Sequence, residues 1–398
     1  MDVARLKQRV CARVDELAPA LIATSHEIHA HPELCYEEHF AHDLLTALLE
    51  REGAEVAPGA YGLATAFDAR AGGEGPTVVV CCEYDALPGI GHACGHNVIA
   101  AATAGAGLAA AAVAEEAGGR VRVLGTPAEE GGAGKVELAN RGALDGVDAA
   151  MMVHPAGADL ATMDSLAAAM LEVEYFGEAA HAAAAPQRGR NALDAAVLGY
   201  MNVAALRQHI ADTDRVHGVF TKGGDKANIV PDHTAMGWMV RSARAPSLDP
   251  LKARVLACFD AGALATGCSV RHRFVSHDYA EMVDNPVLID LYAANSANLG
   301  RPLSRVPGPA DRVVGSTDMG NVSYLVPSIH PMIKVSPSGI SIHSAEFARH
   351  AGSPAGDQAV IDGAKALAMT ITDLWVVEGA LDRVKAAFAP PASSLRRR

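Results

Sequence analysis

The chain has 398 residues, of which 50% are hydrophobic, and its 33 Lys and Arg against 46 Asp and Glu give a formal net charge of −13. A chain of this length can bury a large core and predicts two or three domains. The negative charge repels phosphate backbones and anionic lipid surfaces, which argues against a nucleic-acid-binding or membrane-surface protein.

The cysteines and the N-terminal segment indicate a reducing compartment. Seven cysteines form an odd set without the regular spacing of a disulfide framework, so free thiols are expected. The N-terminal segment mixes charges at helical spacing and lacks the apolar stretch of a signal peptide. The uncharged segment 98–114 is mostly Ala and Gly, too short and too weakly apolar for a bilayer. We therefore expect a cytoplasmic protein.

The first part of the chain alternates helical and strand patterns. Apolar spacing predicts helices over 10–28 and 37–52, and an alanine-rich helix over 98–114. Continuous apolar runs predict buried strands, and a short helix lies among them; in chain order these are 77–82, 120–124, 135–141 (the helix) and 149–153. Polar clusters follow the strand ends. This order predicts an α/β sheet with its site at the carboxyl ends of the strands.

A different pattern begins near Ala167. The order strand, helix, strand, strand, helix, strand is expected over 169–176, 191–210, 216–221, 235–241, 248–265 and 269–276. This β-α-β-β-α-β order is the ferredoxin-like split unit. After residue 280 the α/β character returns, with helices predicted over 287–299 and 359–377. The chain therefore predicts a domain over 167–280 inserted into another formed by 1–166 and 281–398.

The stretch GIGHACGHNVIA places Cys94 and His96 just before a predicted helix. A helix N-terminus favours the thiolate, which can act as a nucleophile or as a metal ligand. Further Cys or His pairs at short spacing, as in a structural zinc site, are missing from the sequence. Taken alone, this pair is equally compatible with ordinary packing.

Three other segments strengthen the interpretation as a metal site. Glu129 and Glu130 follow a predicted strand, so one carboxylate can bind a metal while the other faces the substrate as a general base. His154 ends another strand, and His343 lies in a Gly- and Ser-rich loop. Strand ends at one sheet edge converge in space. Five ligands are thus predicted, which could hold two metals sharing a bridging thiolate: Cys94, His96, Glu130, His154 and His343.

The order of motifs resembles a known family. The motifs HPE, DALPG, HACGHN, TPAEEGG, VHP, GEAAHAAAAP, NIVPD, GSTDMGNVSY and IHSAEF span nearly the whole chain. Together they resemble the aminoacylase/carboxypeptidase-G superfamily of dimetal peptidases, and more closely its amidohydrolase branch with a Cys ligand. This branch includes the indole-acetyl-amino-acid, p-aminobenzoyl-glutamate and β-alanyl-dipeptide hydrolases. Asn97, after the histidine of CGHN, is more similar to the last two.

The resemblance implies a fold and roles for individual residues. It implies a mixed-sheet metallopeptidase catalytic domain whose inserted ferredoxin-like domain acts as lid and dimerisation domain, forming a homodimer. It implies the five ligands above, two divalent ions (zinc or manganese, with cobalt or nickel as alternatives), and Glu129 as general base. His181 would reach into an active site, typically the partner subunit's, and Asn228 and Arg241 would lie near the substrate carboxylate or the oxyanion. His92, Asp85 and Asp318 have no assigned role, although Asp85 could orient a ligand.

These parts predict hydrolysis of the amide bond of an N-acyl amino acid or small dipeptide by a metal-activated water, with a Glu general base. Two other interpretations stay open. The chain could be a non-catalytic or partner-dependent subunit of a hydrolase complex, although a degenerate site should have lost some ligands. Alternatively Cys94 could be the nucleophile of a metal-independent hydrolase.

Overall fold

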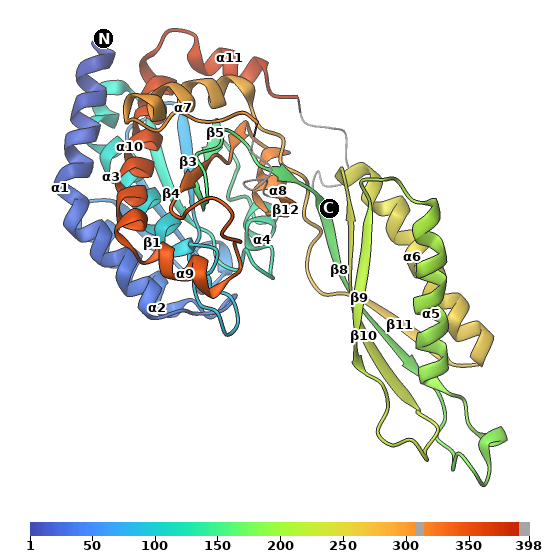
Figure 1. Ribbon diagram of the computed structural model, residues 1–398. Helices are drawn as coiled ribbons and strands as arrows, with labels where there is room; N and C mark the ends of the chain where they lie inside the picture. Colours follow the sequence, from blue (N-terminus) through green and yellow to red (C-terminus); the bar gives the residue numbers. More distant parts are fainter. Residues whose placement is uncertain (307–313, 390–398) are drawn as a thin grey trace. The chain divides into compact units, whose positions relative to one another are not determined.

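The structure is a computed structural model in which residues 1–306 and 314–389 are described (Figure 1). The chain divides into two compact units. The first contains Met1–Asp164 and the described residues from Met282 onward, and the second contains Ser165–Glu281. The boundaries expected from sequence, 167 and 280, lie within two residues of these; the last nine residues of the domain expected over 281–398 lie outside the described part.

The first unit is built on a six-stranded mixed sheet. The strand order is β1-β2-β4-β3-β5-β13, with β3, β4, β5 and β13 parallel and β1 and β2 antiparallel to their neighbours. Its strands are β1 (Glu55–Pro58), β2 (Phe67–Gly72), β3 (Thr77–Cys82), β4 (Arg120–Gly125), β5 (Ala149–Met151) and β13 (Ser328–Ile329). A separate parallel pair joins β6 (His154–Ala156) to β14 (Met332–Lys334).

Helices cover both faces of this sheet (Figure 1). Alternate residues of β3 point to opposite faces, so Val78 and Val80 join the larger core cluster, and Val79 and Cys81 join the smaller one. The larger cluster packs under α1 (Val3–Ala30), α2 (His39–Arg51), α3 (His96–Ala117), α7 (Pro286–Asn298) and α10 (Pro354–Val376). The smaller packs under α4 (Gly134–Asn140) and α8 (Met319–Ser323). The remaining helices are α9 (Ala345–Ala351), α11 (Ala380–Ala386) and the 3-10 turn Ala60–Gly62.

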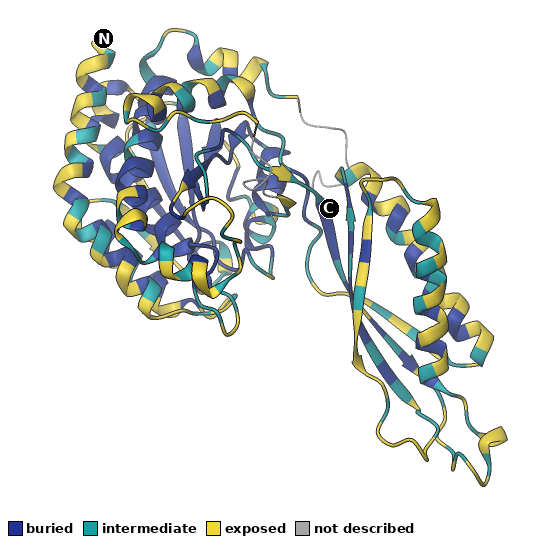
Figure 2. Ribbon diagram, viewed as in Figure 1, coloured by how far each residue is buried: buried dark blue, intermediate teal, exposed yellow. Residues whose placement is uncertain are grey.

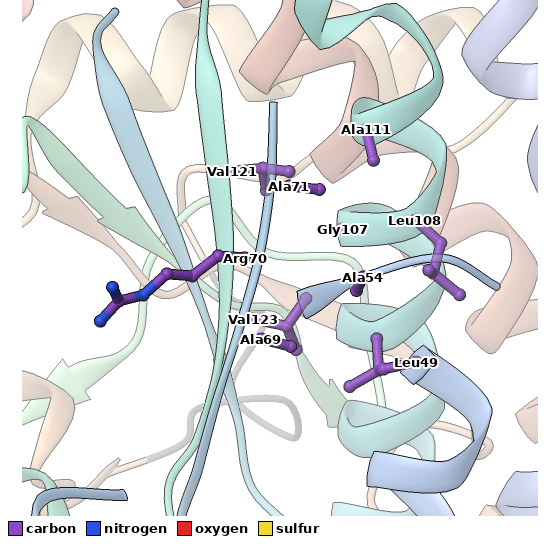
Figure 3. Close-up of a pocket in the computed structure, with 10 residues that line it drawn as sticks. All are labelled: Leu49, Ala54, Ala69, Arg70, Ala71, Gly107, Leu108, Ala111, Val121 and Val123. Carbon is purple, nitrogen blue, oxygen red and sulfur yellow. The ribbon is translucent and has the colours of Figure 1, made fainter. Parts of the chain in front are cut away.

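Small residues let α3 lie close to the sheet. A Cβ added to Gly107 would lie 2.1 Å from Val123 Cγ2, so only glycine fits there. Figure 3 shows the small apolar cavity beside this contact, with Arg70 extending away from it to the other side of β2. Among the described residues, α3 is the one helix with the length and hydropathy of a membrane span. However, 89% of its apolar window is buried within the structure, as in the core helix of a folded domain.

The second unit has the order β-α-β-β-α-β. Its elements are β8 (Ala167–Phe176), α5 (Ala192–Leu206), β9 (Arg215–Lys222), β10 (His233–Ser242), α6 (Ala245–Thr266) and β11 (Ser269–Phe274), with 3-10 turns Pro186–Arg188 and Arg207–His209. The sheet is antiparallel in the order β11-β8-β10-β9, and the two helices pack on one face around Tyr175, Trp238 and Phe259. This is the ferredoxin-like arrangement.

Two details differ from the sequence-based expectation. The strand expected over 149–153 is broken, because β5 ends at Met151 and His154 opens β6, which pairs with β14 instead of β13. The helix expected over 359–377 is not the last one, since α11 follows α10 after a turn at Gly379. Short strands β7 (Asp164–Ser165) and β12 (Val314–Gly315) were not expected.

Candidate metal centre

The segment from Gly89 to His96 leads from β3 into α3. Gly95 has a left-handed backbone, with φ +76°, and a Cβ there would lie 2.8 Å from Pro155 Cγ. Glycine therefore permits the sharp turn that sets Cys94 and His96 at the start of the helix. His96 is fully buried, and its Nδ1 lies 3.0 Å from Asp85 Oδ1.

Asp85 holds two parts of the site together. Its second oxygen, Oδ2, accepts a hydrogen bond from the backbone N–H of Glu130 at 2.9 Å. Burial alone would raise the pKa of Asp85, but the neighbouring His96 holds that pKa at about 2. The residue left without a role in the sequence thus orients His96 and fixes the Glu130 backbone, as a partner behind a ligand does.

The structure brings the five predicted ligands together. Their ligand atoms form overlapping groups in which all atoms of a group lie within 4.8 Å of one another. The groups are Cys94, His96 and His154; Cys94, Glu130 and His343; and His96, Glu129 and Glu130. Individual separations are 3.4 Å from Cys94 Sγ to His154 Nε2 and 3.4 Å from His343 Nε2 to Glu130 Oε1.

The donor set fits divalent metal ions. His154 donates its Nδ1 hydrogen to Pro155 O at 2.8 Å, which leaves Nε2 unprotonated and facing Cys94. Burial lowers the pKa of His154 to about 3, which keeps the ring neutral. His96 Nε2 is buried without a hydrogen-bond partner among residues 1–306 and 314–389. Imidazole nitrogens, a thiol and a carboxylate are the donors that zinc and its neighbours prefer.

Beside this cluster lies a second group of buried acids, Glu83, Glu129 and Asp318. Their negative charge is offset by Lys135, which is 1% exposed and whose Nζ lies 2.6 Å from Asp318 Oδ1 and also pairs with Glu83. Asp318 Oδ2 accepts from the backbone N–H of Lys135 at 2.9 Å. Burial, and then the charge of Glu83, raise the pKa of Glu129.

Sequence reasoning missed Glu83 and Lys135 and left Asp318 without a role. Glu83 directly follows the buried strand 77–82, so its place at a strand end was the available clue. Lys135 gave none, since a lysine at a helix start is ordinarily exposed. His92, which also had no role, is 2% exposed, and burial lowers its pKa to about 3.

The other three predicted site residues belong to the second unit. His181 and Asn228 lie on adjacent segments, because Ala182 N–H donates to Asn228 O at 3.0 Å. Arg241 lies near the opposite end of β10, which spans roughly 25 Å from His233 to that residue at about 3.3 Å per residue. Within this unit, the structure therefore brings His181 and Asn228 together and separates Arg241 from them.

An α/β sheet with a thiol, imidazoles and carboxylates gathered at its strand ends defines a metal-dependent hydrolase with room for two ions. Residues 79–373 match the family described as Peptidase family M20/M25/M40. The chain belongs to this family, and the predicted fold class and metal-dependent amidohydrolase activity are thereby confirmed.

Several relatives align with most of the chain. The chain is 40% identical over 397 residues to the Xaa-Arg dipeptidase of Mus musculus, covering 96% of this chain and 92% of that protein. It is 34% identical to one of the p-aminobenzoyl-glutamate hydrolase proteins of Escherichia coli, over 62% of this chain and 56% of that protein.

Solved structures show the same fold. A putative aminohydrolase from methicillin-resistant Staphylococcus aureus superposes with a TM-score of 0.73 at 19% identity, covering 92% of this chain and 99% of that one. A dinuclear metal-binding peptidase of the M20 family from Bacillus subtilis gives 0.69 at 19% identity, covering 90% of this chain and 99% of that one.

Proposed function

We propose that the protein is a dipeptidase that cleaves the amide bond of small dipeptides with a C-terminal arginine or similar basic residue. The observation that carries this proposal is the gathering of five metal-ligand side chains next to a buried carboxylate, Glu129, in a chain 40% identical to an Xaa-Arg dipeptidase over 96% of its length. A net charge of −13 also favours the approach of a cationic substrate.

The ligands for two ions would be Cys94, His96, Glu130, His154 and His343, with the Cys94 thiolate able to bridge. Zinc or manganese suits this set, with cobalt or nickel as alternatives. When bound, the ions would supply Lewis acidity at the scissile carbonyl and lower the pKa of an attacking water.

Glu129 is the proposed general base. Its carboxylate lies beside the ligand cluster and is 8% exposed, so it can face a substrate while Glu130 faces the ions. It accepts a proton as water attacks the carbonyl carbon, and passes that proton to the departing amine nitrogen. Lys135 limits the repulsion between Glu129 and the nearby acids.

His181 is the proposed stabiliser of the oxyanion. Its Nδ1 accepts the backbone N–H groups of Ala183 and Ala184 at 3.2 and 3.1 Å, so the hydrogen of the neutral ring resides on Nε2. The side chain is exposed and offers Nε2–H to a negatively charged oxygen. Asn228, next to it, and Arg241 are proposed contacts of the substrate carboxylate or the oxyanion.

The second unit is the proposed lid and dimerisation domain. Helix α5 exposes Val197, Leu198 and Met201, and the edge strand β9 exposes Val219 and Phe220. An edge strand next to an apolar helix face suits pairing with a second copy of the chain, since both backbone groups and apolar surface are then covered. A homodimer should elute at twice the chain mass in size-exclusion chromatography with light scattering, and a monomer would contradict this proposal.

A reducing compartment, the cytoplasm, is also proposed. Its support is that all seven cysteines are free in the structure.

The activity is tested by removing and restoring metal. Protein treated with a chelator should lose hydrolysis of alanyl-arginine, and zinc, manganese, cobalt or nickel added singly should restore it and identify the metal. The same preparations should be assayed with alanyl-alanine, a β-alanyl dipeptide, an N-acetyl amino acid and p-aminobenzoyl-glutamate. Full activity without metal, combined with loss on alkylation, would instead support Cys94 as nucleophile. Faster cleavage of p-aminobenzoyl-glutamate than of alanyl-arginine would overturn the substrate assignment.

A further inference from the structure

The residue before the two adjacent glutamates has a strained backbone. Ala128 is fully buried and has φ +59°, in the left-handed region that non-glycine residues rarely occupy. Such a conformation costs about 1–3 kcal/mol and persists only where its surroundings hold it. The turn also directs the chain into Glu129, because Gly132 N–H donates back to Ala128 O at 3.0 Å.

A buried carboxylate holds this residue from another part of the chain. Glu38, 90 residues earlier and 0% exposed, accepts the backbone N–H of Ala128 on its Oε1 at 2.8 Å. The same loop holds the turn at a second point, since Tyr36 Oη donates to Gly132 O at 3.0 Å. The bond from Ala128 is therefore part of a built contact between the loop before α2 and the turn that carries Glu129.

Glu38 does not serve the helix that it begins. It is the N-cap residue of α2, a position where side chains ordinarily accept a hydrogen bond from their own helix, yet it makes no side-chain capping bond. A buried carboxylate that gives up this bond and reaches Ala128 instead is best explained by a need at the turn.

We infer that Glu38 is a positioning residue for Glu129: its bond to the Ala128 amide keeps the turn left-handed, and the turn aims Glu129 and Glu130 in different directions. The inference rests on the proposed role of Glu129. Without the acceptor, the Ala128 N–H would be buried and unpaired, and the backbone would relieve this by leaving the left-handed region. That change would rotate the following glutamates.

The first measurement is independent of activity. Hydrogen exchange at the Ala128 amide of the metal-loaded protein should be slow, should accelerate about ten- to a hundredfold in Glu38→Ala, and should stay slow in Glu38→Gln, whose amide oxygen still accepts. The matched control is Glu37→Ala, which removes a neighbouring carboxylate that is 77% exposed. Exchange that is unchanged in Glu38→Ala would overturn the inference.

The second measurement is kcat and KM with alanyl-arginine. Glu38→Ala should lower kcat about tenfold or more with little change in KM, and Glu38→Gln should stay close to wild type. Adding Ala128→Gly to Glu38→Ala should recover most of kcat, because glycine adopts the left-handed turn without strain. A purely structural role predicts no recovery by this glycine, and that result would overturn the inference.

The two proposals fail differently. Glu129→Gln with wild-type activity, or activity without metal, would reject the proposed function, while the exchange measurement would still decide the contact between Glu38 and Ala128. Normal kcat in Glu38→Ala, together with strongly reduced kcat in Glu129→Gln, would reject only the positioning role.

Discussion

The two units of this chain place their charges in opposite locations. In the first unit the sheet ends hold buried carboxylates, imidazoles and one lysine, among them Glu83, His96, Lys135 and Asp318, all at most 1% exposed. In the second unit the core is aromatic and aliphatic, while the charged side chains of β8 and β11 lie at the surface. Figure 2 shows the contrast as a mostly buried sheet in the first unit and strands of alternating burial in the second.

This difference separates two tasks. Burying charge is costly unless each charge is paired or binds a metal, so a unit that does it at several strand ends is built for chemistry. A split β-α-β-β-α-β sheet with an apolar core needs no such groups to fold, and its exposed residues are available for contacts. The predictions below test whether buried charge matters chiefly in the first unit.

The largest effect is expected at the buried carboxylate of the first unit. Glu129→Gln keeps the shape of the side chain but cannot accept a proton, so kcat should fall about 10²- to 10⁴-fold. Metal content, measured by mass spectrometry, should stay at the wild-type value because the five ligands remain. The control is Glu115→Gln, an exposed carboxylate on α3. A near-normal rate would remove Glu129 from the role of base.

The next effect concerns stability. Asp68 is 1% exposed and accepts two hydrogen bonds from Arg122, 6% exposed, at 3.0 and 2.8 Å. Asp68→Asn would leave the Arg122 charge buried and unpaired, so the free energy of unfolding should fall by about 3–5 kcal/mol. Urea denaturation measures this, with Arg70→Met as the control, because the Arg70 side chain is 52% exposed.

The same pair predicts a pH dependence. Burial would raise the pKa of Asp68, but hydrogen bonds from Arg122 and Arg70 outweigh it and lower that pKa. The stabilisation is therefore fully present above the ordinary Asp pKa, about 3.9, and is lost as the pH falls through the lower folded value. The stability difference between wild type and Asp68→Asn should shrink below about pH 4. A difference that grows on acidification would contradict the assigned ion pair.

The strand ends were predictable because periodicity and residue type carry that information. TVVVCC could be read as a buried strand, and the ligands at the ends of such strands converge by a general property of α/β sheets. The ferredoxin-like unit was also readable from its alternating strands. By contrast, β1 and β2 were not expected, since EVAP and FDARAG are short and mix charged with small residues.

Other features depend on contacts that no local pattern contains. Lys135 pairs with Asp318, which is 183 residues later, so its burial could not be read from GGAGK. Ala128 gives no sign of a left-handed backbone, because glycine is the residue that usually marks one. The separation of Arg241 from Asn228 follows from the length of β10, whereas a family resemblance gives roles without distances.

A smaller effect on turnover is expected from the second unit. His181→Ala removes the proposed oxyanion donor and should lower kcat about a hundredfold, less than the upper range for Glu129→Gln. Metal content and thermal stability should not change, since the ring lies at the surface of its own unit. His209→Ala, an exposed histidine of the same unit, is the control. Unchanged kcat in His181→Ala would confine the chemistry to the first unit.

The smallest effect is expected for an exposed ion pair of the second unit, the counterpart of Asp68 and Arg122. Glu172 and Arg273 form an ion pair across β8 and β11 with side chains 47% and 61% exposed. Water and salt screen such a pair, and ordering two long side chains opposes it, so their coupling energy should be at most about 1 kcal/mol. A double-mutant cycle with Glu172→Gln and Arg273→Met, measured by urea denaturation in low and high salt, tests this. A coupling as large as that between Asp68 and Arg122 would show that strand charges stabilise both units, and the division between a charged chemical unit and an apolar scaffold would then be wrong.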